Sequence, residues 1–300
     1  QAARRGRTDH ARHHAAGARL PVANAWQAAL AAGGEIEAGE SASVVRDVAM
    51  NCLAGEKVLY AGHAVAAVAA TAPEIAAEAL DLIETTYEVL PHVIDVMDAM
   101  AEDAPVLHED LFTKGVNPKP AKPSNIAHKS VMGRGDVPGA FASADVVIEG
   151  RYDTAAVHQG YIEPHACVAA WGADGQGTVW CSSQGQFLVR ALCAKILNMP
   201  LSDLKVIPAE IGGGFGGKTT VYLEPVALAL SKKCGRPVKM VMSREEVFHA
   251  SGPTSGTVID IKLAATKNGR ITAADMVLRY QAGAFPGSPA HLGAMTALAC

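Results

Sequence analysis

A chain of 300 residues with 49% hydrophobic and 19% charged residues has room for two domains and enough apolar side chains for a core, which argues against a disordered protein. The small net charge of −4, without a Lys/Arg cluster interleaved with aromatics, argues against nucleic acid as a partner. The longest apolar run, residues 64–72, is far shorter than the ~20 residues that span a bilayer, so no membrane segment is predicted.

The cysteines are spread along the chain without a Cys-x-x-Cys pair. This spacing argues against a zinc ribbon, a cysteine-ligated iron–sulfur cluster and a disulfide framework. Free thiols fit a reducing compartment best, and we therefore expect a cytoplasmic protein. The six are Cys52, Cys167, Cys181, Cys193, Cys234 and Cys300.

Both ends of the chain are atypical. Residues 1–32 are rich in Ala, Arg and His without a helical or strand period, so we expect a poorly ordered leader in which His10, His13 and His14 are solvated. Residues 293–300 are apolar and carry no stop signal, which suggests that the polypeptide is incomplete.

Residues 33–108 predict a small module of strand, helix and strand. Residues 57–70 have a strand-like pattern that breaks at Gly62. Pro73 then opens a helix that continues to Glu84, with apolar side chains at helical spacing. Residues 87–91 return to a strand pattern.

Residues 109–144 predict a linker, because alternating prolines over 117–124 cannot donate backbone hydrogen bonds. Residues 145–300 then predict one mixed domain. Its expected strands are 145–149, 161–171, 178–183, 204–208 and a buried one at 237–242, and its expected helices are 186–198 and 220–233. Residues 257–263 pair with 270–280 across Asn268-Gly269, a strong hairpin signal. The predicted fold class is α+β.

Five glycines fill six positions over residues 212–217, between a predicted strand and a predicted helix. Consecutive glycines let backbone N–H groups converge on a ligand and approach it closely, as in a cradle for an anion or an oxo group. A loop that merely needs positive φ angles explains a bare glycine run equally well.

The same residues satisfy the P-loop pattern, from Gly212 to Thr219, which makes a P-loop NTPase an alternative function. Three features argue against it. Phe215 occupies the tight turn, Pro225 lies in the following helix, and the apolar run that ends in Asp260 belongs to an antiparallel hairpin instead of a parallel strand.

Residues 212–218 resemble the Gly-Gly-Gly-Phe-Gly-Gly-Lys segment in the molybdenum-binding large subunits of the xanthine dehydrogenase/aldehyde oxidase family. Residues 179–184 and 194–200 follow that family's order of strand, glutamine and helix, and residues 55–69 and 87–91 look like its hammerhead domain. The resemblance implies a hammerhead-like α/β module, incomplete over 33–108, followed by the first part of a molybdenum-binding α+β domain over 145–300.

The resemblance implies that Gln184 reaches the molybdenum oxo group and that the backbone around Phe215 faces the other ligands of the metal. It implies cofactor contacts from Gly213, Gly214 and Gly216 as well. The chemistry is suitable, because a neutral amide donates to an oxo oxygen without adding charge and loop N–H groups stabilise developing negative charge. For Gln184 taken alone, a strand-end glutamine that bonds the backbone is the simpler interpretation.

Thr219 stands on the substrate side where xanthine-type members place a purine-binding glutamate, so purine hydroxylation is disfavoured. The family's catalytic glutamate, its substrate-side arginine and most pterin contacts are expected beyond Cys300, so no catalytic base is assigned in this chain. Glu163-Pro-His165 resembles a supporting segment near the active site. A metal site of His158, Glu163 and His165 is disfavoured, because His158 and Glu163 fall on opposite faces of a strand.

By resemblance, the intact enzyme is an oxidoreductase that uses a molybdenum–molybdopterin dinucleotide to insert water-derived oxygen into a C–H bond of an aldehyde or N-heteroaromatic. The sequence has no motif for the 2Fe-2S and FAD centres that accept the electrons, so these are expected on partner subunits. We expect a hetero-oligomer, such as a dimer of heterotrimers, in which this chain alone is inactive. A non-catalytic remnant of the same fold is the third candidate.

Overall fold

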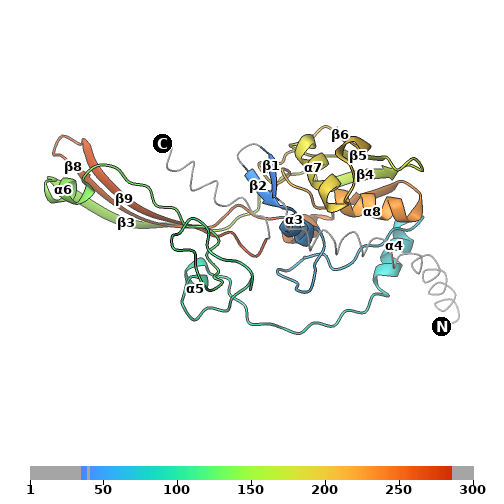
Figure 1. Ribbon diagram of the computed structural model, residues 1–300, viewed down its shortest axis with the longest axis horizontal. Coiled ribbons are helices and arrows are strands. Elements are labelled where there is room, and N and C mark those ends of the chain that lie inside the picture. Colours follow the sequence, from blue (N-terminus) through green and yellow to red (C-terminus); the bar gives the residue numbers. More distant parts are fainter. Residues whose placement is uncertain (1–34, 39–40, 286–300) are drawn as a thin grey trace. The chain divides into compact units, whose positions relative to one another are not determined.

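The computed structural model describes residues 35–38 and 41–285 (Figure 1). Helices and strands are mixed along the chain, as the predicted α+β class requires. Contacts divide the chain into two units, of which the first includes His158–Pro253 and the second includes Glu88–Val157 and Thr254–Ala284. The predicted leader with its histidines and the apolar segment 293–300 lie outside the described residues.

A four-stranded sheet forms the centre of the first unit. Its order is β6-β5-β4-β7, with β5 and β6 parallel and the other neighbours antiparallel. A parallel pair needs a crossover connection, which α7 (Gln186–Ile196) and the short η2 (Leu201–Asp203) supply. The strands are β4 (Ala166–Trp171), β5 (Gly177–Cys181), β6 (Leu204–Pro208) and β7 (Val238–Val241).

Helices α7 and α8 (Glu224–Cys234) pack on the sheet and on each other, and α3 (Val45–Cys52) packs against α7. Strand residues alternate between the two faces. Ala169 and Val179 are paired neighbours and fully buried, whereas Trp180 on the opposite face is 42% exposed. The core therefore lies between the sheet and its helices.

Several predicted elements of this unit differ in extent. The helix expected over 220–233 begins only at Glu224, which places Pro225 in the first turn, where a missing N–H breaks no helical hydrogen bond. The strand expected over 161–171 begins at Ala166. The strand expected to be buried at 237–242 lies at the sheet edge, and Val241 is 50% exposed.

The predicted strands 57–70 and 87–91 are wrong, since the described part of the chain has no strand between β2 and β3. Val89, in the second of these segments, is 87% exposed. An alternating apolar pattern forms a strand only where a neighbouring strand pairs with it. The helix opened by Pro73 forms, but α4 (Pro73–Leu80) ends before Glu84. The remaining elements are β1 (Glu35–Ala38), β2 (Ser41–Val44) and α9 (Arg244–Ala250).

The second unit contains the antiparallel sheet β3-β8-β9 and confirms the predicted hairpin. Asp260 in β8 is bound by Arg151 at 2.6 Å and by Arg279 at 2.7 Å, and these hydrogen bonds lower the pKa of its carboxyl to about 2. The elements are β3 (Val146–Thr154), β8 (Thr257–Ala265), β9 (Ile271–Tyr280), α5 (Val96–Ala99) and α6 (Val137–Ala142).

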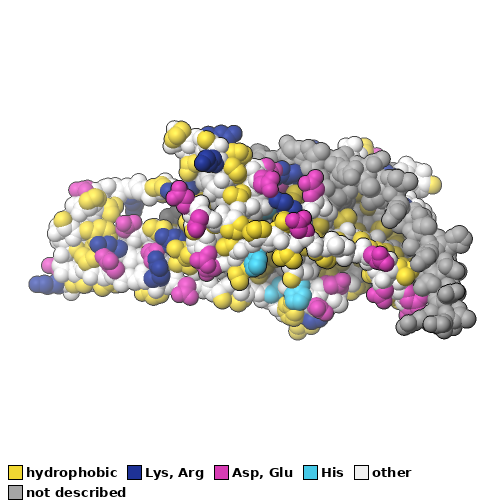
Figure 2. Space-filling model, turned by 90° about the horizontal axis from the view of Figure 1, so that it is seen from below, with side chains coloured by type: hydrophobic (Ala, Val, Ile, Leu, Met, Phe, Trp, Pro, Cys, Tyr) yellow, Lys and Arg dark blue, Asp and Glu magenta, His cyan; other side chains and the backbone are white. Residues whose placement is uncertain are grey.

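Acidic and basic side chains are interspersed over the face shown in Figure 2, in keeping with the small net charge. No helix within the described ranges is long and apolar enough to cross a membrane. The domain limits expected at 32/33, 108/109 and 144/145 stay a prediction.

Candidate cofactor site

The glycine loop and Gln184 meet because β5 and β6 are parallel neighbours. The chain leaves β5 at Cys181 and reaches Gln184 three residues later, and it leaves β6 at Pro208 shortly before the loop 212–217. The carboxyl ends of parallel strands open at the same sheet edge, where ligands of such sheets usually bind. The topology thus brings the two predicted elements to one place.

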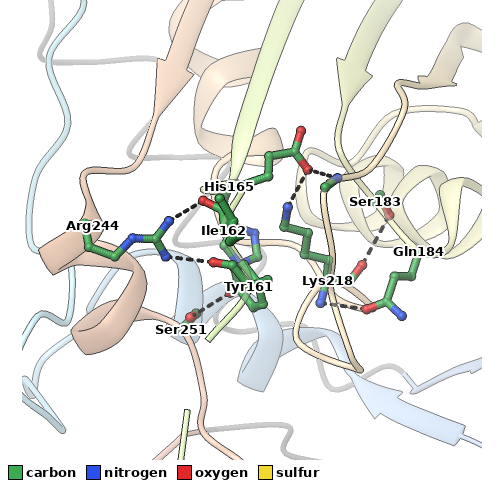
Figure 3. Close-up of polar contacts among 10 residues, drawn as sticks. Tyr161, Ile162, His165, Ser183, Gln184, Lys218, Arg244 and Ser251 are labelled. Carbon is green, nitrogen blue, oxygen red and sulfur yellow. Dashed lines mark hydrogen bonds and ion pairs between the residues drawn. The ribbon is translucent and has the colours of Figure 1, made fainter. Parts of the chain in front are cut away.

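Gln184 is held by the loop through three hydrogen bonds. Its side-chain Oε1 accepts the N–H of Gly216 at 3.0 Å and that of Lys218 at 3.1 Å, and Figure 3 shows the bond to Lys218. The main-chain N–H of Gln184 donates to the Lys218 carbonyl at 2.9 Å. Two donors on Oε1 fix the orientation of the amide, so that Nε2 is the remaining donor. That NH₂ group has no partner among the residues that the structure describes.

Two loop glycines are required by close approach. A Cβ atom on Gly214 would lie 2.4 Å from Gln184 Oε1, and one on Gly217 would lie 2.7 Å from a ring carbon of Tyr161. Neither distance is possible for a real side chain. The glycines thus let the loop backbone close over Gln184 on one side and Tyr161 on the other.

Phe215 lies between these glycines in a strained conformation. Its φ is 50°, in the left-handed region that residues other than glycine rarely occupy, and its side chain is 73% exposed. Such strain persists where the surroundings enforce it and is concentrated at ligand sites. An exposed, strained phenylalanine is therefore a candidate ligand contact, as predicted for this position.

Lys218 points away from the loop interior and into the protein. Its side chain is 0% exposed, and Nζ donates to Glu163 Oε2 at 2.7 Å and lies 4.9 Å from the centre of the Tyr161 ring. Burial tends to raise the pKa of the Glu163 carboxyl, but the Lys218 ammonium and the Gly212 N–H outweigh it and lower the pKa.

This arrangement argues against the P-loop alternative. A P-loop lysine must reach the phosphates, whereas the ammonium of Lys218 is occupied by Glu163. The helix that should start next to Thr219 begins only at Glu224. Asp260 lies in an antiparallel ladder and is held by two arginines, so it does not offer the carboxylate of a Walker-B strand.

The segment before β4, residues 158–165, packs against the glycine loop and is itself held by hydrogen bonds. The Tyr161 hydroxyl lies 2.6 Å from His165 Nε2 and 3.2 Å from Ser251 Oγ, and His158 Nε2 lies 2.9 Å from the same serine. Arg244 of α9 donates to the carbonyls of Tyr161 and of the next residue. The Nε2 atom of each histidine is therefore occupied by a hydroxyl group.

Sequence reasoning found Glu163-Pro-His165 as a supporting segment but missed Tyr161 and Arg244. The contacts of Arg244 reach back more than 80 positions, for which the sequence has no local signal. Thr219, expected on the substrate side, is exposed and donates its hydroxyl hydrogen to the Gly216 carbonyl at 2.9 Å. Its place relative to a substrate stays a prediction.

His165 should make the stability of the protein sensitive to acid. Burial, followed by the charges of Lys218 and His158, lowers the pKa of His165 from 6.5 to about 4. The unfolded state therefore binds this proton at a higher pH than the folded state does. The contribution of neutral His165 to the free energy of unfolding is fully present above about pH 6.5 and is lost as the pH falls toward about 4.

We expect the free energy of unfolding to fall by about 2 kcal/mol between about pH 7 and pH 5 through this residue. Urea unfolding of the wild type and of His165→Gln at both values measures it, and the variant should lose less stability on acidification. The exposed His92→Gln is the control and should behave like wild type. Equal pH dependence in all three proteins would contradict the assignment.

Comparisons with known proteins agree with a cofactor site at this position. Residues 118–299 match the family model described as the molybdopterin cofactor-binding domain. The chain is 35% identical over 234 residues to the nicotinate dehydrogenase large molybdopterin subunit of Eubacterium barkeri, covering 78% of this chain and 52% of that protein. It is 34% identical over 237 residues to the carbon monoxide dehydrogenase large chain of Afipia carboxidovorans, covering 78% and 29%.

Among solved structures, reconstituted CO dehydrogenase from Oligotropha carboxidovorans matches with a TM-score of 0.61 and 31% identity, covering 69% of this chain and 26% of that chain. The aldehyde oxidoreductase from Desulfovibrio gigas matches with a TM-score of 0.59 over 70% and 22%, and its 24% identity shows the fold alone. The predicted fold class is confirmed. The chain spans about half the length of the first relative and less than a third of the others.

Proposed function

The chain belongs to the molybdopterin cofactor-binding domain family, and from this premise we propose that it forms one wall of the molybdenum centre in the large subunit of a molybdenum hydroxylase. The resemblance stated from residues 212–218 is thereby confirmed at the level of the family. The observation that carries the proposal is Gln184, whose amide oxygen is fixed by two loop N–H groups while its NH₂ group has no partner among the described residues.

The site fits a bound oxo group in shape and in chemistry. Gly214 and Gly217 leave no space for side chains, so the backbone itself forms the surface of the loop. A Cβ on Gly216 would meet nothing within 4 Å, so this part of the loop faces open space. Donors without added charge suit an anionic metal centre, because hydrogen bonds to charged acceptors are the strong ones.

The cofactor, when bound, supplies the transferred oxygen and accepts two electrons from the substrate. In this proposal Gln184 Nε2 would donate a hydrogen bond to the metal centre, and Gly213, Gly214, Phe215 and Gly216 would line the loop side of the cofactor site. Preorganised donors of this kind stabilise charge that develops during a reaction, because they need no reorganisation. The base that takes the proton is expected outside residues 1–300.

The finer parts of the proposal rest on the family. They are a dinucleotide form of the cofactor, a substrate among aldehydes or N-heteroaromatics, and 2Fe-2S and FAD subunits in a cytoplasmic hetero-oligomer. Thr219 disfavours a purine, since it is not the glutamate expected for purine binding. The third candidate, a non-catalytic remnant, is less well supported, because the backbone strain at Phe215 is of the kind that is concentrated at ligand sites.

Phe215→Asp in the complete large subunit tests this proposal. The carboxylate would face an anionic cofactor, so we expect molybdenum per subunit, measured by mass spectrometry, to fall by about tenfold or more, which needs only ~1.4 kcal/mol of lost binding. Leu201→Asp, which places the same charge at a 50% exposed apolar position in η2, should retain the metal. Full molybdenum in Phe215→Asp, or ATP hydrolysis that is lost with Lys218→Ala, would overturn the proposal.

A further inference from the structure

We propose that Glu163 is a positioning residue for Gln184 and acts through Lys218. The effect on turnover rests on the function proposed above, whereas the effect on the loop concerns this chain alone. No hydrogen bond among the described residues joins Glu163 directly to Gln184, and Lys218 is bonded to both of them. The inference therefore consists of two contacts in series and the charge that joins them.

The first contact joins both ends of the glycine loop. Glu163 Oε2 accepts the N–H of Gly212 at 2.7 Å and the ammonium of Lys218 at 2.7 Å, and the Glu163 N–H donates to the Gly212 carbonyl at 3.3 Å. Gly212 opens the loop and Lys218 follows its last glycine. A single carboxylate oxygen thus holds the start and the end of the loop together.

The second contact joins Lys218 to the cofactor-facing side. The main chain of Lys218 bonds Gln184 twice, because its N–H donates to Oε1 at 3.1 Å and its carbonyl accepts the Gln184 N–H at 2.9 Å. The same carbonyl accepts the Ser183 hydroxyl at 3.4 Å. Any shift of the Lys218 backbone must therefore change the position of Gln184.

Charge makes Glu163 necessary for this position. The Lys218 side chain is completely buried, and an ammonium in such a place needs a paired anion to stay there. The Tyr161 ring is a second, weaker partner of the ammonium. Glu163 itself is 31% exposed and can be solvated alone, so Lys218 is the member of the pair that must move when the pair is broken.

Loss of the Glu163 charge should therefore draw Lys218 Nζ toward water and displace its backbone. Gln184 Oε1 would then keep only the Gly216 N–H, and its amide would be free to rotate. Glu163 has no predicted contact with substrate. We expect kcat to fall while KM stays unchanged, as for a group that acts by orienting another.

Hydrogen exchange of the backbone amides of Gly216 and Lys218, in the 300-residue chain without cofactor, tests the link. Glu163→Gln keeps an acceptor for Gly212 but removes the charge, and exchange at both amides should rise on the order of tenfold. Glu210→Gln is the matched control, because Glu210 is an exposed acidic residue just before the loop. In this control variant the amides of Gly216 and Lys218 should exchange as in wild type.

A second variant distinguishes position from general stability. Glu163→Gln combined with Lys218→Met leaves no buried charge to be drawn out, so protection of the Gly216 amide should return toward the wild-type value. Unchanged exchange in Glu163→Gln, or faster exchange that extends equally to core amides such as Val179, would overturn the proposal. Because no metal is involved, this result does not depend on whether the complete subunit binds molybdenum.

Discussion

Replacement of Gln184 by alanine in the complete, metal-loaded subunit is expected to lower kcat by about 10² to 10³, the effect of removing one preorganised donor from a reaction centre. The loss should come from Nε2, which faces away from the two loop N–H groups that hold Oε1. Stability should change less, because Gln184 is exposed and its main-chain bond to Lys218 remains.

Steady-state kinetics of enzyme with matched molybdenum content measures this effect. Gln176→Ala is a suitable control, since Gln176 is an exposed residue in the turn between β4 and β5. It should turn over like wild type. Wild-type turnover in fully metallated Gln184→Ala would remove Gln184 from the reaction centre.

Gly214→Ala is expected to affect both turnover and metal retention. The added methyl would lie 2.4 Å from Gln184 Oε1, so the loop and the amide cannot both keep their places. We expect a loss of kcat of about 10² or more, because the same amide is displaced, and a loss of about 1–3 kcal/mol of stability from overpacking.

Molybdenum content, kcat and urea unfolding of Gly214→Ala provide the three measurements. Gly133→Ala is the control, because a Cβ at Gly133 would meet no atom within 4 Å and its φ is not positive. It should match wild type in all three. A Gly214→Ala protein that keeps full turnover would show that the loop does not need to close over Gln184.

The sequence was informative where the signals are local or linked by a short crossover. Asn268-Gly269 predicted the β8–β9 hairpin, and residues 204–208 form β6 as expected. The resemblance implied that Gln184 and the glycine loop contact one cofactor, and the order of strand, helix and strand explains how they meet. That order makes β5 and β6 parallel, and parallel neighbours bring the residues after them to one edge.

Other parts could not be predicted because they depend on distant partners. The strand expected at 57–70 lacks a neighbour to pair with, and its apolar pattern alone does not determine an element. The ion pair of Lys218 with Glu163 joins residues 55 positions apart. From the sequence, Lys218 was only a lysine that could meet a phosphate, and its burial against a carboxylate becomes evident from the packing.

Burial also determines the chemistry of the thiols. Cys52, Cys167 and Cys193 are enclosed in the core, where burial, with Glu224 adding to it, raises the pKa of each thiol well above its ordinary value. The pKa of Cys181 rises to about 12 for the same reasons. Oxidants and alkylating agents react with the thiolate, which is hardly populated at these positions. The folded core thus protects these thiols from oxidation and alkylation, whatever the redox state of the surroundings. This protection ends when the chain unfolds.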